Sequence, residues 1–132
     1  FANEELIKDL EKIKYSTNPY NINRLTQTAG TAAMQENSYY MANCKRICDT
    51  RETVTKALRE IGFEVLDSKT NFIFAKHESI SGMDIYTLLR EKGILVRHFT
   101  DERIKDYNRI TIGSQEEMEV FVDTMKKIVK GA

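Results

Sequence analysis

The sequence predicts an α+β fold in which helices cover one side of a small, mostly antiparallel sheet. Two observations lead to this prediction. Apolar residues recur at the three- and four-residue spacing of helices as far as Gly62, and after it short runs of β-forming residues alternate with further helical segments. Each helical segment is apolar along one stripe only, so each has a single side to bury.

Two helices are expected in the first part of the chain. The first spans residues 3–14 and ends before Pro19, because a proline moves the preceding residue out of the helical region. Its apolar stripe consists of Leu6, Ile7, Leu10 and Ile13. The second runs from Asn23, a capping residue, to Gln35 and is crowded with small residues. We expect it to pack closely against a neighbour that lies outside these 132 residues.

A long third helix is expected over residues 39–61, after a break at 36–38 and before Gly62, which supplies the C-terminal stop. Its stripe consists of Cys44, Ile47, Cys48, Arg51, Val54, Leu58 and Ile61. Cys44 and Cys48 lie four residues apart on this stripe, where a disulfide would need distorted geometry. We expect both cysteines to be small buried residues.

The second half of the chain predicts four strands and two more helices. The strands cover residues 63–66, 71–76, 93–99 and 107–113. One helix follows Ser81, which with Asp84 resembles a capping box, and ends before Gly93. The last helix follows Ser114, which forms a better capping box with Glu117.

Arg97 and Arg109 lie on the last two predicted strands. If these strands pair antiparallel, the end of one lies beside the start of the other, and the two guanidiniums converge at the sheet edge. Two guanidiniums, each with parallel N–H donors, can bind the oxygens of a phosphate or a carboxylate. The alternative is that both are ordinary surface arginines that pair with Asp101, Glu102 or Asp106.

The composition argues against several classes of function. The chain has 20 Lys and Arg against 20 Asp and Glu, whereas a general nucleic-acid binder carries a basic excess. No apolar run approaches the length of a membrane span, so no membrane partner is expected. Motifs for phosphate loops, zinc sites and nucleophile elbows are absent, and no metal is expected. The chain begins with Phe1 instead of Met, which suggests a piece cut from a longer protein.

Four stretches of the chain carry a resemblance to a known family. They are Pro19–Asn23, then Gly62–Val65 leading to Ser68–Phe72, then Gly93–Arg97, and finally Arg109–Glu117. In their order and spacing, the chain resembles the C-terminal part of a class I/II (fold-type I) pyridoxal-phosphate aminotransferase. Within that family it is most similar to the histidinol-phosphate branch.

The resemblance implies roles for three residues and a division of the chain. Arg109 would grip the acidic group of the substrate, Arg97 would help to hold a phosphate, and Asn71 would lie close to this anion site. Residues 1–35 would be the tail of the large domain with the start of a long interdomain helix. Residues 36–132 would be the small domain.

The resemblance also implies a parent enzyme. It would be a cytoplasmic homodimer of histidine biosynthesis that uses pyridoxal phosphate to transfer an amino group between histidinol phosphate and 2-oxoglutarate. The lysine that holds the cofactor would belong to the large domain, so no catalytic or cofactor-binding residue is expected here, and the fragment alone would be inactive. The alternative is a stand-alone α+β regulatory module that binds a phosphorylated or carboxylated metabolite without chemistry.

Overall fold

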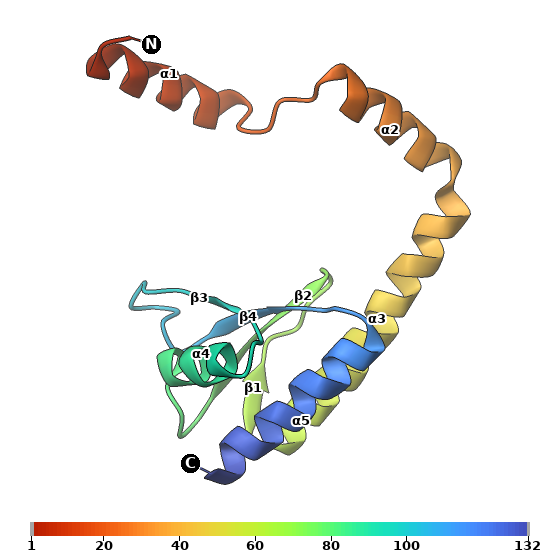
Figure 1. The fold of residues 1–132 in the computed structure, drawn as a ribbon, viewed down its shortest axis with the longest axis vertical. Coiled ribbons are helices and arrows are strands. Elements are labelled where there is room, and N and C mark those ends of the chain that lie inside the picture. The colour runs from red at the N-terminus through yellow and green to blue at the C-terminus, as the bar shows by residue number, and fades with distance from the viewer. Residues whose placement is uncertain (1, 132) are drawn as a thin grey trace. The chain divides into compact units, whose positions relative to one another are not determined.

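The computed structural model describes residues 2–131 and divides the chain into two compact units, the first ending at Tyr40 and the second beginning at Met41. Its helices and strands, shown in Figure 1, are α1 (Glu4–Thr17), α2 (Arg24–Gln35), α3 (Asn37–Glu60), β1 (Phe63–Val65), β2 (Phe72–His77), α4 (Gly82–Glu91), β3 (Arg97–His98), β4 (Asn108–Thr111) and α5 (Gln115–Gly131). The predicted order of elements is confirmed.

The N-terminal unit consists mainly of α1 and α2, and asparagine caps begin both helices. The side chain of Asn3 accepts the Leu6 N–H at 2.9 Å, and that of Asn23 accepts the Thr26 N–H at the same distance. Neither helix has a buried residue. The apolar stripe of α1 is exposed, with Ile13 at 63%. Local capping and helix propensity therefore define these helices, without a core beneath them.

The C-terminal unit is built on an antiparallel sheet with the strand order β1-β2-β4-β3. Alternate residues of its strands are buried, as expected for a sheet that is covered on one side. The buried apolar residues that the strands contribute are Phe63, Val65, Ile73, Ala75 and Ile110. The opposite side, here called the open face, carries Glu64, Phe72, Phe74, Lys76, Arg97, Arg109 and Thr111.

Helices α3, α4 and α5 complete the core. Leu58 of α3 and Leu89 of α4 have no exposed surface, and Met125 of α5 is 1% exposed. These side chains pack with the buried strand residues in one cluster. Figure 1 shows α5 running alongside the C-terminal half of α3. The fold class is therefore the predicted one, a small antiparallel sheet with its helices on one side.

Glycines end the helices as predicted. Gly62 follows α3 with φ +93°, and Gly93 follows α4 with φ +77°, so both occupy the left-handed region in which glycine is favoured. The Ser114–Glu117 capping box is reciprocal: the Ser114 N–H donates to Glu117 Oε2 at 2.8 Å and the Glu117 N–H to Ser114 Oγ at 3.3 Å.

Several predictions differ from the structure, among them the end of the first helix, which lies at Thr17 instead of residue 14, and the last strand, which covers Asn108–Thr111 instead of residues 107–113. The strand predicted over residues 93–99 is reduced to β3, because Ile94 N–H still bonds back to Leu89 O at 2.9 Å and only Arg97 and His98 join the ladder. The break predicted at 36–38 is confined to Glu36, and α3 starts at once. Cys44 is exposed and Cys48 is half-buried, so the predicted burial was wrong for Cys44. The stripe of α3 enters the core only from Ile47 onward.

Gly82 offers a test of the packing between α4 and the β3–β4 loop. A Cβ on Gly82 would lie 2.5 Å from Lys105 O and 2.8 Å from the Asp106 carbonyl carbon, both of them backbone atoms. We expect Gly82→Ala to lower the free energy of unfolding by about 1–3 kcal/mol, because backbone must move to make room. Chemical denaturation measures this. Gly30→Ala is the control, because a Cβ there meets nothing within 4 Å, and it should be neutral or slightly stabilising.

Candidate anion-binding site

Arg97 and Arg109 face each other across the β3–β4 ladder. They are Cα partners in the antiparallel register, so their side chains leave the sheet on the same side, the open face. Both are exposed. The structure thus brings together the two arginines that the sequence predicted to converge.

No acid neutralises this pair within residues 2–131. The arginines whose guanidiniums make hydrogen bonds or ion pairs are Arg51, Arg59, Arg90 and Arg103. Of the acids expected as ordinary partners, Asp101 pairs with Arg103 at 3.2 Å and Glu102 with Lys105 at 2.7 Å. Like charges directly opposite each other on adjacent strands destabilise a sheet. An unneutralised arginine pair is the arrangement that an anion from outside the chain would stabilise.

Aromatic rings flank the two guanidiniums. The Arg97 Cζ lies 5.5 Å from the centre of the Phe99 ring, and the Arg109 Cζ lies 5.2 Å from that of Phe72. Phe74, the Cα partner of Arg109, contacts Phe99 with ring centres 5.9 Å apart. Sequence reasoning missed these aromatic contacts. The sequence did hold a signal for them: in a strand over residues 72–76, every second side chain lies on the same face of the sheet, which puts Phe72 and Phe74 together.

Asn71 precedes β2, at the strand end where Phe72 pairs with Thr111. Its carbonyl accepts the Ile112 N–H at 2.9 Å, and the residue is exposed. Asn71 therefore lies just beyond the end of the β2–β4 ladder that contains Arg109, and no hydrogen bond joins the two side chains among the described residues.

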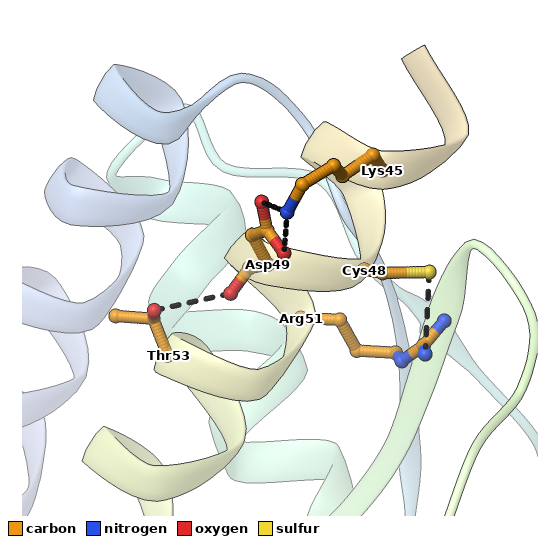
Figure 2. Close-up of polar contacts among 5 residues, drawn as sticks. All are labelled: Lys45, Cys48, Asp49, Arg51 and Thr53. Carbon is orange, nitrogen blue, oxygen red and sulfur yellow. Dashed lines mark hydrogen bonds and ion pairs between the residues drawn. The ribbon is translucent and has the colours of Figure 1, made fainter. Parts of the chain in front are cut away.

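Arg51 of α3 supports the turn that carries Asn71. It is 9% exposed, and its Nη1 donates to Thr70 O at 2.5 Å while its Nη2 lies 3.7 Å from Cys48 Sγ. Figure 2 shows this arginine with Cys48 and, on another side of α3, the Lys45–Asp49 ion pair at 2.8 Å. The sequence placed Arg51 on the apolar stripe of its helix without a role. The signal in the sequence that could have indicated this role was a single arginine at an otherwise apolar position of the helix.

Behind the arginine pair, His98 and Asn108 are Cα partners on the helix-covered side. The Asn108 amide donates from Nδ2 to Gly82 O at 2.8 Å and so ties β4 to the start of α4. Its Oδ1 and His98 Nδ1 are buried and have no partner among residues 2–131. Arg97 and His98 are consecutive residues of β3, so their side chains leave the sheet on opposite sides.

Glu64, Lys76 and Tyr107 form a polar cluster beside β1. The Tyr107 hydroxyl donates to Glu64 Oε1 at 2.6 Å, and Lys76 Nζ lies 3.1 Å from Glu64 Oε2. These contacts, with the Tyr107 bond the larger cause, hold the pKa of Glu64 below its ordinary value of 4.5. The same carboxylate raises the pKa of Lys76.

This cluster predicts a pH dependence of stability. A carboxyl group whose pKa is depressed by folding contributes stability above its unfolded pKa, and this contribution is lost as the pH falls through the folded pKa. Glu64→Gln should therefore lower the urea midpoint at pH 7, and the difference from the unmodified protein should vanish well below pH 4.5. Glu60→Gln, an exposed change on α3, is the control and should have no effect at either pH.

Two kinds of site are not found among residues 2–131. No group of three or more histidine, cysteine, aspartate or glutamate side chains is arranged to hold a metal ion. No helix there combines the length and the apolar character that a membrane crossing requires.

Comparison with known proteins identifies the family. The model for "Aminotransferase class I and II" matches residues 1–125. The histidinol-phosphate aminotransferase of Brachyspira hyodysenteriae is 48% identical over 98% of this chain and 36% of its own length. The crystal structure of the enzyme of that name from Clostridium acetobutylicum is 25% identical, with a TM-score of 0.77 over 98% of this chain and 39% of that one.

A second solved structure shares the fold. The histidinol-phosphate aminotransferase of Sinorhizobium meliloti, solved in complex with pyridoxal-5'-phosphate, is 18% identical, with a TM-score of 0.75 over 92% of this chain and 34% of that one. The chain thus spans little more than a third of the length of the proteins it matches. By its sequence and its fold, the chain belongs to the class I and II aminotransferase family.

Proposed function

We propose that this chain is the C-terminal part of a histidinol-phosphate aminotransferase, and that Arg109 and Arg97, with Asn71 nearby, bind the anionic group of the substrate. The observation that carries this proposal is the arginine pair itself: two guanidiniums at partner positions of the ladder, exposed and without an acidic neighbour among residues 2–131. A phosphate offers enough oxygens for both forks.

The relatives support the choice of substrate. The Brachyspira protein and the Clostridium acetobutylicum enzyme are both named for histidinol phosphate. That compound carries the phosphate that an arginine pair would favour. Each charge-assisted hydrogen bond would contribute about 1.5–3 kcal/mol to binding. The regulatory-module alternative finds no support in the relatives reported above.

Pyridoxal phosphate is the cofactor that we propose for the longer protein. Its attachment needs a lysine that can lose its proton. Lys45, Lys76 and Lys105 each bind a carboxylate that raises the pKa of the lysine. These three lysines do not fit that role, and we propose that the lysine that holds the cofactor belongs to the large domain, outside these 132 residues. The part of this chain in the reaction would be to bind and orient the substrate anion.

The organisation of the longer protein is also a proposal. Residues 1–35 would close the large domain and begin the interdomain helix, and residues 36–132 would form the small domain. The exposed apolar stripe of α1 supports this division, since such a stripe is normally covered. We further propose that the enzyme acts in the cytoplasm, as a homodimer, in histidine biosynthesis with 2-oxoglutarate as the other substrate.

The direct test is an assay of the full-length protein, encoded by the gene that contains this segment. With bound pyridoxal phosphate, it should transfer an amino group between histidinol phosphate and 2-oxoglutarate and should discriminate strongly against histidinol, which lacks the phosphate. Equal kcat/KM values for the two compounds would contradict the proposed anion site. An upstream reading frame without a cofactor domain would favour the regulatory module.

The isolated chain should not form a stoichiometric complex with the cofactor. After addition of pyridoxal phosphate, an ultraviolet-visible scan should show only the weak, scattered reaction of surface lysines. A stoichiometric band that borohydride fixes to a single lysine would show that the chain holds a cofactor site of its own.

A further inference from the structure

We infer that Phe99 and Phe72 are positioning residues, which hold the guanidiniums of Arg97 and Arg109 ready for the substrate anion. This inference rests on the proposed function, because it assigns a role to two rings beside the proposed anion site. It goes beyond that function by naming what keeps the two arginines in place.

The backbone places each ring beside its arginine. Phe99 follows Arg97 by two residues, just past the end of β3, and its ring contacts that of Phe74 on the open face. Phe72 lies two residues before Phe74, the Cα partner of Arg109, and therefore stands diagonally across the ladder from that arginine. The contacts follow from this placement, with 5.5 Å between Arg97 Cζ and the Phe99 ring centre and 5.2 Å between Arg109 Cζ and that of Phe72.

Each ring is itself held in place. Phe72 and Phe99 are half-buried, whereas the two arginines are exposed. The Phe99 ring meets the Phe74 ring edge-on at 79°, and Phe74 in turn stacks on Tyr107 with centres 4.7 Å apart. Phe99 thus belongs to an aromatic row of Phe99, Phe74 and Tyr107 on the open face, and Phe72 is held by its partial burial on β2, whereas both arginines are exposed.

The rings solve a problem that the arginine pair creates. Two positive charges opposite each other repel, and two free arginine side chains would swing apart into solvent. The face of an aromatic ring is electronegative and attracts a cation within about 6 Å of its centre. A ring next to each guanidinium offsets part of this repulsion. Unlike an acidic side chain, the ring leaves the N–H donors of the guanidinium free to bind an anion. Fewer side-chain conformations then remain to be lost when the anion binds.

The test uses the full-length enzyme and separates aromatic from merely apolar contact. Phe99→Leu keeps an apolar side chain but removes the ring face. It should raise KM for histidinol phosphate about two- to fivefold with kcat retained, whereas Phe99→Tyr should restore the original value. Phe72→Leu and Phe72→Tyr should behave alike. Phe63→Leu, a core change that touches neither arginine, is the control: it should lower the melting temperature and leave KM unchanged.

A double-mutant cycle shows whether each ring acts through its arginine. Phe99→Leu should have no further effect on KM once Arg97→Ala is present, because the side chain that the ring holds is gone. An undiminished effect in the Arg97→Ala protein, or a leucine variant that equals the tyrosine variant, would overturn the inference. If Arg97→Ala and Arg109→Ala themselves leave KM unchanged, it is the proposed function that fails.

Discussion

Arg109→Ala in the full-length enzyme should lower kcat/KM for histidinol phosphate about 10- to 100-fold, mainly through a rise in KM. The loss corresponds to about 1.5–3 kcal/mol, the contribution of a hydrogen bond to a charged group. Arg109 is the better choice than Arg97 for this test, because β4 pairs on both sides whereas β3 is a two-residue strand at the edge of the sheet. Steady-state kinetics with each substrate varied in turn provide the measurement.

A matched control and a graded variant make this result specific. Arg103→Ala removes another exposed arginine, one that pairs with Asp101 in the β3–β4 loop, and should leave the kinetics unchanged. Arg109→Lys keeps the charge but loses the planar fork, so it should fall between the alanine variant and the unmodified enzyme. Kinetics of Arg109→Ala that equal those of Arg103→Ala would remove Arg109 from the substrate site.

Arg51→Ala should be the most damaging change for stability near the site. It removes a guanidinium that is 9% exposed, leaves Thr70 O without its donor, and opens space beside Cys48. We expect the free energy of unfolding to fall by about 2–4 kcal/mol, from the lost charge-assisted bond and the lost packing of the side chain. Chemical denaturation gives this value directly.

Kinetics of the same variant test the link to the anion site. Because Arg51 supports the turn that carries Asn71, KM for histidinol phosphate should rise at a temperature where the variant is still folded. Arg46→Ala, on the exposed side of the same helix, should change stability by less than about 0.5 kcal/mol and leave KM unchanged. If Arg51→Ala were as mild as Arg46→Ala, the support of the turn by α3 would be unimportant.

The sequence alone predicted the backbone arrangement of the site, because that arrangement follows from local patterns. Two segments with the two-residue alternation of strands, joined by a polar loop, predict a pair of antiparallel strands. This strand pairing alone brings Arg97 opposite Arg109. The capping of α5 by Ser114 was predictable for the same reason, since both partners lie within one helical turn.

What depends on distant neighbours could not be predicted. The ring beside Arg109 belongs to Phe72 on another strand, and the side-chain orientations that bring them together depend on packing across the sheet. Cys44 continues the helical stripe of α3, and periodicity does not show where such a stripe leaves the core. The apolar stripe of α1 predicted a helix, but periodicity does not show what covers such a stripe, and α1 has no buried residue in the part of the chain that the structure describes.

The short outer strands have a consequence for association between molecules. A sheet edge presents unpaired backbone groups on which another chain can add a strand, and short edges with charged side chains resist this. Both edges here are of that kind: β1 has three residues with Glu64 at its centre, and β3 has two residues, one of them Arg97. Arg97 would then protect the sheet from edge-to-edge aggregation as well as serve the substrate. Replacing Arg97 by an apolar residue could therefore lower the solubility of the protein even if substrate binding were kept. Both substrate binding and solubility would then favour an arginine at this position.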